Sequence, residues 1–162
     1  MKRDSRLSNI LHALLHMADH AARHGTPMTS DQLAVCLSTN PVVVRRTMSG
    51  LRDQGLVASE KGHGGGWRLA RPLDQVTLGQ VHAALGEPGL FLEAPPVEAD
   101  GCLVEAAVNA ALSDTYAAAR ALLVARLDSI TLADLAADFS RRLAAHPKRD
   151  LLHAHQRKSD AP

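Results

Sequence analysis

The chain of 162 residues is poor in aromatic side chains and in cysteine. Phenylalanine, tryptophan and tyrosine together occur only at Trp67, Phe91, Tyr116 and Phe139. Runs of β-branched residues are also scarce outside 42–44, which argues against an all-β fold. Two cysteines cannot build a disulfide framework, so nothing in the composition indicates export.

Long uninterrupted hydrophobic runs are missing as well. The apolar stretch that begins at Ile10 is broken by His12, His16, Asp19 and His20, which fits a signal peptide poorly and excludes a membrane span there. No Ser/His/Asp order, catalytic carboxylate pair or Gly-Lys-Ser/Thr phosphate loop occurs, so we expect no enzyme. We expect a cytoplasmic protein with no membrane partner.

The charges are unevenly distributed along the chain. Residues 1–71 carry 10 basic and 5 acidic side chains, residues 72–140 carry 2 and 10, and residues 141–162 carry 6 and 2. A basic N-terminal half predicts a surface for a polyanion, although ordinary clustering of charge is the alternative.

The hydrophobic periodicity predicts a mainly α fold with one small β-hairpin. We expect helices over 7–24, 30–37, 41–54, 78–85, 103–127 and about 129–143, and strands over 56–59 and 67–70. Thr29 with Gln32 forms a capping-box pattern, and Asn40 followed by Pro41 is a strong helix start.

This order of elements is that of a winged helix-turn-helix. The third helix carries Val42, Arg45 and Arg46 on its outer face, where they can reach a thymine methyl and guanine edges. Lys61 and Arg68 flank a glycine turn that can approach phosphates closely. The predicted DNA-binding residues are Thr29, Ser38, Asn40, Val42, Arg45, Arg46, Ser49, Lys61, His63, Gly64, Gly65 and Arg68. Each feature alone also fits a solvated face or a flexible turn, whereas their joint order is specific.

The segment 59–71, SEKGHGGGWRLAR, resembles the wing signature of the Rrf2 family of regulators, a Ser-x-Arg-Gly-x-x-Gly-Gly-Tyr-x-Leu-Ala pattern. Lys61 replaces the usual Arg and Trp67 the usual Tyr. The resemblance extends over about residues 5–140. It implies a homodimeric transcriptional repressor that binds a palindromic operator in double-stranded DNA.

The sensor region departs from the family pattern. Cluster-binding members carry three cysteines between the fourth and fifth helices, whereas this chain has only Cys102 there. Because an iron–sulfur cluster generally needs four ligands, we expect no cluster and no other cofactor. Cys102 is a candidate redox sensor: the start of a helix favours its thiolate, and Asp100 and Glu105 disfavour it. An inert thiol, or control by a small molecule near Phe91 and Leu92, are the alternatives.

Four histidines, at positions 12, 16, 20 and 24, recur at a spacing of four residues. Such imidazoles share a helix face, but no cysteine or carboxylate pattern accompanies them, so we expect no metal site.

The long helix over 103–127 has apolar residues on more than one face, which predicts pairing with a second copy. The predicted dimer residues are Val104, Val108, Ala111, Leu112, Ala119, Leu122 and Leu123. We divide the chain into a DNA-binding head (1–86), a sensor loop (87–101), a dimerisation region (102–145) and a basic flexible tail (146–162). A winged-helix module that binds proteins instead of DNA is the second hypothesis.

Overall fold

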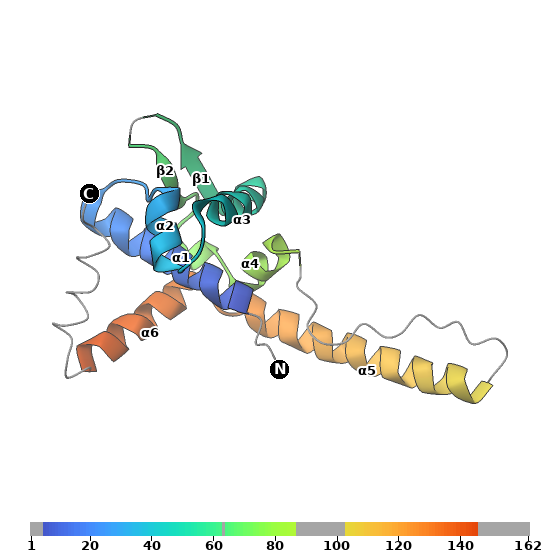
Figure 1. Cartoon of the computed structure of the whole chain (residues 1–162). Helices are drawn as coiled ribbons and strands as arrows, with labels where there is room; N and C mark the ends of the chain where they lie inside the picture. Colours follow the sequence, from blue (N-terminus) through green and yellow to red (C-terminus); the bar gives the residue numbers. More distant parts are fainter. Residues whose placement is uncertain (1–4, 63, 87–102, 146–162) are drawn as a thin grey trace.

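The computed structural model describes residues 5–62, 64–86 and 103–145. The elements in chain order are α1 (Ser5–His24), α2 (Ser30–Cys36), α3 (Pro41–Asp53), β1 (Val57–Glu60), β2 (Gly66–Leu69), η1 (Leu73–Gln75), α4 (Leu78–Ala84), α5 (Leu103–Asp128) and α6 (Leu132–Ala145). The two strands form one antiparallel hairpin. The predicted mainly α fold with a small β-hairpin is therefore confirmed, as a winged helix-turn-helix head with a long helix projecting from it (Figure 1).

The helix starts follow the capping chemistry of the sequence. At α2 the Gln32 N–H donates to Thr29 Oγ1 over 3.2 Å, and the Thr29 N–H donates to Gln32 Oε1 over 2.8 Å. A second reciprocal pair, Thr77 and Gln80, begins α4. Each pair satisfies backbone donors that the first helical turn leaves unpaired.

The core of the head collects side chains from nearly every element. The largest fully buried side chains are Leu14, Leu33, Met48, Leu51, Leu56, Leu132, Val44, Val57, Val76 and Val81. Leu132 belongs to α6, far along the chain from the others. Its position is fixed by a short backbone bridge: Leu78 N–H donates to the Ile130 carbonyl, and Leu132 N–H donates to the Val76 carbonyl, both over 2.9 Å. The start of α6 is thus part of the head.

Helix α5 differs from the other α-helices because none of its 26 residues is buried. It is about 39 Å long and extends away from the head (Figure 1). Its C-terminal end lies against α4, where a side chain on Gly79 would collide with Asp128. Through this end α5 packs on the head. No helix of the described residues combines the length and apolarity needed to cross a membrane.

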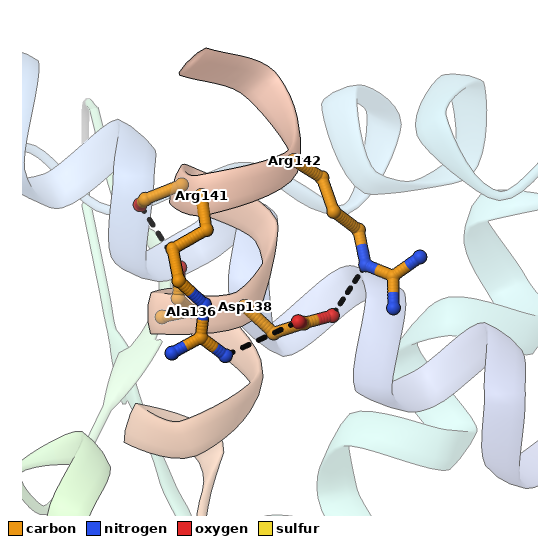
Figure 2. Close-up of polar contacts among 5 residues, drawn as sticks. Ala136, Asp138, Arg141 and Arg142 are labelled. Atoms are coloured by element: carbon orange, nitrogen blue, oxygen red, sulfur yellow. Dashed lines mark hydrogen bonds and ion pairs between the residues drawn. The ribbon is translucent and has the colours of Figure 1, made fainter. Parts of the chain in front are cut away.

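Helix α6 carries a small cluster of charges on its exposed side. Asp138 accepts from Arg142 Nε over 2.5 Å and from Arg141 Nη2 over 3.2 Å (Figure 2). These two hydrogen bonds hold the pKa of the Asp138 carboxyl below its ordinary value. At the start of the same helix Asp134 accepts from the Thr131 backbone N–H and hydroxyl, which likewise lowers the pKa of Asp134.

Element boundaries differ from the predictions by up to three residues, the largest difference being the start of α6 at Leu132 instead of about 129. The strands lie at 57–60 and 66–69 instead of 56–59 and 67–70, because the register places Gly66 opposite Glu60. Helix α1 begins at Ser5, and the short helix η1 was not predicted.

Candidate nucleic-acid interface

The turn between α2 and α3 fixes the angle between the two helices of the reading head. Ser38 has a left-handed backbone with φ of 49°, a conformation that serine rarely adopts. The turn is held by two backbone hydrogen bonds, from Ser38 to the Val35 carbonyl and from Thr39 to the Ala34 carbonyl. The helix pair is therefore joined by a defined turn.

Helix α3 has sharply different faces. Val44, Met48 and Leu51 are buried in the core. On the outer face Arg45 and Arg46 are exposed, and Val42 is 63 % exposed. The predicted contact residue Ser49 is half-buried at the edge of this face. The helix thus offers the solvent two guanidinium groups and two apolar side chains near its N-terminal end, since Val43 is also 52 % exposed.

Two predicted contact residues, Thr29 and Asn40, already cap helices. Thr29 Oγ1 accepts from Gln32 N–H, and Asn40 Oδ1 accepts from Val42 N–H over 2.8 Å. These contacts use the side-chain oxygens as acceptors. The threonine hydroxyl hydrogen and the asparagine amide NH₂ can still donate hydrogen bonds to a phosphate.

The wing is the hairpin of β1 and β2. Gly62 and Gly64 have φ of 101° and 84°, the left-handed region that favours glycine. A side chain at Gly65 would collide with the Glu60 carbonyl. Lys61 is exposed beside this turn. His63, predicted to contact DNA, lies outside the described residues.

Arg68 is exposed on β2, but its guanidinium group forms an ion pair with Glu60. Its Nε lies 2.6 Å from Glu60 Oε1 across the hairpin. Both side chains are about half exposed, with 57 % and 45 % of their surface accessible. A phosphate approaching Arg68 therefore competes with the carboxylate of Glu60, which is not among the predicted DNA-binding residues.

The wing is tied to the start of α2 through Trp67. Met28 and Trp67 pair antiparallel: the Met28 N–H donates to the Trp67 carbonyl over 3.0 Å, and the Trp67 N–H donates to the Met28 carbonyl over 2.8 Å. The Trp67 indole N–H also donates to Ser30 Oγ over 3.0 Å. The sequence did not predict the roles of Met28 and Ser30. Its only indication was Trp67 itself, because a buried indole N–H generally needs a hydrogen-bond acceptor. The wing and α2 thus belong to one bonded unit.

The predicted dimer residues are mostly open to solvent. Along α5 the exposed fraction is 73 % for Val104, 52 % for Val108, 38 % for Leu112 and 75 % for Leu122. Ala111 and Ala119 are also exposed, and Leu123 is half-buried. Cys102, the candidate sensor, lies outside the described residues, as do the loop 87–101 and the tail 146–162.

Comparison with known proteins gives one family. A family model described as an iron-dependent transcriptional regulator, Rrf2, matches residues 3–138. An HTH-type transcriptional regulator of Mycobacterium tuberculosis is 29 % identical over 136 residues, which cover 84 % of this chain and 81 % of that protein. IscR of Aliivibrio salmonicida, an HTH-type transcriptional regulator, is 35 % identical over 89 residues, 54 % of this chain and 51 % of that protein.

Solved structures agree with this match. A transcriptional regulator from Lactobacillus plantarum is 26 % identical and has a TM-score of 0.70, covering 95 % of this chain and 99 % of that chain. CymR, the global cysteine regulator of Bacillus subtilis, is 27 % identical and has a TM-score of 0.58, covering 85 % of this chain and 98 % of that chain. The arrangement of head and long helix is therefore shared with solved regulators.

Proposed function

Because the chain belongs to the Rrf2 family of transcriptional regulators, we propose that it is a homodimeric repressor that binds a palindromic operator in DNA. The family is one of regulators, so the chain is not an enzyme. Two heads on a two-fold axis would read two half-sites separated by about one helical turn of DNA.

The observation that carries this proposal is the joint placement of α3 and the wing. Arg45 and Arg46 are exposed on a helix whose opposite face is buried in the head. The wing is bonded to the start of α2 through Trp67, and α3 packs against both α2 and β1, so the wing and the helix pair form one packed unit. A rigid head with exposed arginines and a glycine-tipped wing suits a duplex, with α3 in the major groove and Lys61 at the phosphates.

Replacing both arginines tests the proposal. Each guanidinium paired with a guanine contributes about 1–3 kcal/mol, so Arg45→Ala with Arg46→Ala should weaken binding by at least about thirtyfold at moderate salt. The matched control is Arg141→Ala with Arg142→Ala, two adjacent exposed arginines on α6 that cause the same change in net charge. An unchanged gel shift for the α3 variant would favour the protein-binding module instead.

Dimerisation is proposed through α5. The helix exposes valine and leucine side chains along most of its length, and no residue of the described chain buries them. A second α5 packed in symmetric contact is the simplest cover for such a surface.

The family description raises the question of iron. A cluster needs four ligands with thiolates prominent, and this chain has two cysteines, of which Cys36 lies half-buried on α2 within the head. Within the described residues no three His, Cys, Asp or Glu side chains come together as a ligand set. The donor set does not fit an iron–sulfur cluster, and we propose that the protein works without one.

The controlling signal is proposed to be the redox state of Cys102, with a small ligand beside the 87–101 segment as the alternative. Selection of bound DNA from a random pool, run with reduced and with oxidised protein, gives the operator and tests the thiol together. Equal affinity in both states would exclude the thiol switch. We also propose that the chain is divided into a head, a sensor loop, a dimerisation region and a tail, with the bounds predicted from the sequence. A cytoplasmic location is proposed as well.

A further inference from the structure

Two histidines of α1 bring their outer ring nitrogens unusually close together. His12 Nε2 and His16 Nε2, on adjacent turns of the helix, are hydrogen-bonded to each other over 2.8 Å, so one of the two rings carries its hydrogen on Nε2. The ring centroids are 4.4 Å apart, and the ring planes are inclined by 72°. His12 is exposed and His16 is half-buried, so the pair lies at the surface of the helix.

This separation suits a bound metal ion. With metal–nitrogen bonds of about 2.1 Å, two nitrogens 2.8 Å apart subtend about 85° at the metal. That is close to the right angle between neighbouring ligands in square-planar and octahedral complexes, which Cu²⁺ and Ni²⁺ favour. A tetrahedral Zn²⁺ would need the nitrogens about 3.3 Å apart, and the rings would have to separate.

The second pair on the same helix is arranged differently. His20 and His24 have the same spacing in sequence, and their ring centroids are 4.6 Å apart. However, His20 Nε2 is hydrogen-bonded to Thr26 Oγ1 over 3.1 Å, a partner outside the pair, whereas His12 Nε2 and His16 Nε2 are hydrogen-bonded to each other. Sequence spacing cannot distinguish the two pairs, whereas the ring positions do.

We propose that His12 and His16 chelate a divalent transition metal that prefers ligands at right angles, Ni²⁺ or Cu²⁺, on the surface of α1. In the metal-free chain one Nε2 donates its hydrogen to the other. To bind the metal, that ring changes tautomer and carries its hydrogen on Nδ1, so that both Nε2 lone pairs are free to coordinate. Among the described residues no third protein ligand joins the pair, so water completes the coordination and binding is reversible.

Occupation of this site would act on the reading head. Helix α1 packs against β2 and α4, and a chelate across one turn locks the helix in the conformation that makes these contacts. Because the unfolded chain has no preformed pair, the metal stabilises the folded state. This inference does not depend on how the protein recognises DNA.

Titration of the full chain with Ni²⁺ followed by calorimetry tests the site. Ni²⁺ is chosen because it does not oxidise the two thiols. His12→Ala with His16→Ala should lose the tightest binding event, with affinity reduced at least about tenfold, and should no longer gain thermal stability from Ni²⁺. The matched control, His20→Ala with His24→Ala, should bind as the natural chain does. The exposed single variant His12→Ala serves if the double variant folds poorly.

Amide NMR signals locate the ion independently of affinity. Paramagnetic Ni²⁺ should broaden the signals around residues 12–16 before those around residues 20–24. The proposal is overturned if the 12/16 variant binds Ni²⁺ as tightly as the natural chain, if the 20/24 variant loses the tightest site, or if Zn²⁺ binds this pair more tightly than Ni²⁺.

Discussion

Met28 and Trp67 exchange both backbone hydrogen bonds, so a single residue before α2 acts as a third strand beside the wing. The same tryptophan donates its indole N–H to Ser30 at the start of α2. Three hydrogen bonds therefore fix the wing relative to the helix-turn-helix. If the head reads DNA as one rigid body, weakening this connection should affect stability and binding together.

Removing the indole donor tests the connection. Trp67→Phe keeps most of the buried ring but loses the bond to Ser30, and we expect the free energy of unfolding to fall by about 1 kcal/mol or somewhat more because the ring is also smaller. Urea denaturation of Trp67→Phe, Ser30→Ala and the double variant measures the coupling between the two side chains. Strictly additive losses would show that the hydrogen bond contributes nothing.

The close approach of the two backbones makes a prediction at Gly66. A side chain there would collide with the Met28 carbonyl, so Gly66→Ala should destabilise the head by about 1–3 kcal/mol and weaken DNA binding. Gly50 is the matched control, since it lies inside α3 and its nearest neighbour would be the Ala84 carbonyl at 3.8 Å. Gly50→Ala should stabilise the protein by about 0.5–1 kcal/mol. Equal effects at both glycines in thermal melts would contradict this.

The sequence predicted the features of the head that depend on near neighbours. The capping pair Thr29 and Gln32, the start of α3 at Asn40 and Pro41, and the buried face at Val44 and Met48 all follow from spacing within one or two turns. The glycine turn of the wing is equally local, because positive φ values require glycine there.

The features that were missed depend on residues far apart in sequence. Met28 pairs with Trp67 only because the hairpin folds back on the segment before α2, and Leu132 enters the core only because Thr131 pairs with Thr77. No periodicity in either segment reports such a contact. Likewise, the pairing of Arg68 with Glu60 follows from the hairpin register.

That ion pair leads to a prediction about DNA affinity. Glu60→Gln removes the carboxylate beside Arg68 and frees the guanidinium for a phosphate, so binding should tighten by about two- to fivefold, as expected from the 0.5–1 kcal/mol of an exposed pair. Fluorescence anisotropy over a range of salt concentrations measures this, and the dependence on salt should become steeper. In an Arg68→Ala background the same substitution should have a smaller effect. An equal effect in both backgrounds would show that Glu60 acts through general repulsion.

The two lowered carboxyl pKa values in α6 predict a loss of stability in acid. The pKa of Asp134 is lowered by hydrogen bonds from Thr131, and that of Asp138 by Arg142 and Arg141. A depressed folded-state pKa contributes stability above the ordinary carboxyl value, and this is lost as the pH falls through the lowered value. Melting temperatures from pH 6 to pH 2 should fall less steeply for Asp134→Asn. At 1 M salt the contribution of Asp138 should shrink because its partners are cations at the surface, and the cap at Asp134 should change less.

The exposed apolar face of α5 makes the last prediction. Val108→Glu with Leu122→Glu places two charges on the face predicted to contact a second copy. Burying these carboxylates without a partner is more unfavourable than the apolar contact is favourable, so the dimer should not form. Light scattering after gel filtration should show a monomer for this variant. Its affinity for a single half-site should be unchanged, whereas tight binding to the full palindrome should be lost. The control is Ala117→Glu, an exposed position on the opposite side of the helix by the 3.6-residue repeat, which should remain dimeric. If both variants stayed dimeric, the dimer would have to form through another surface, and the exposure of Val108 and Leu122 would need a different explanation.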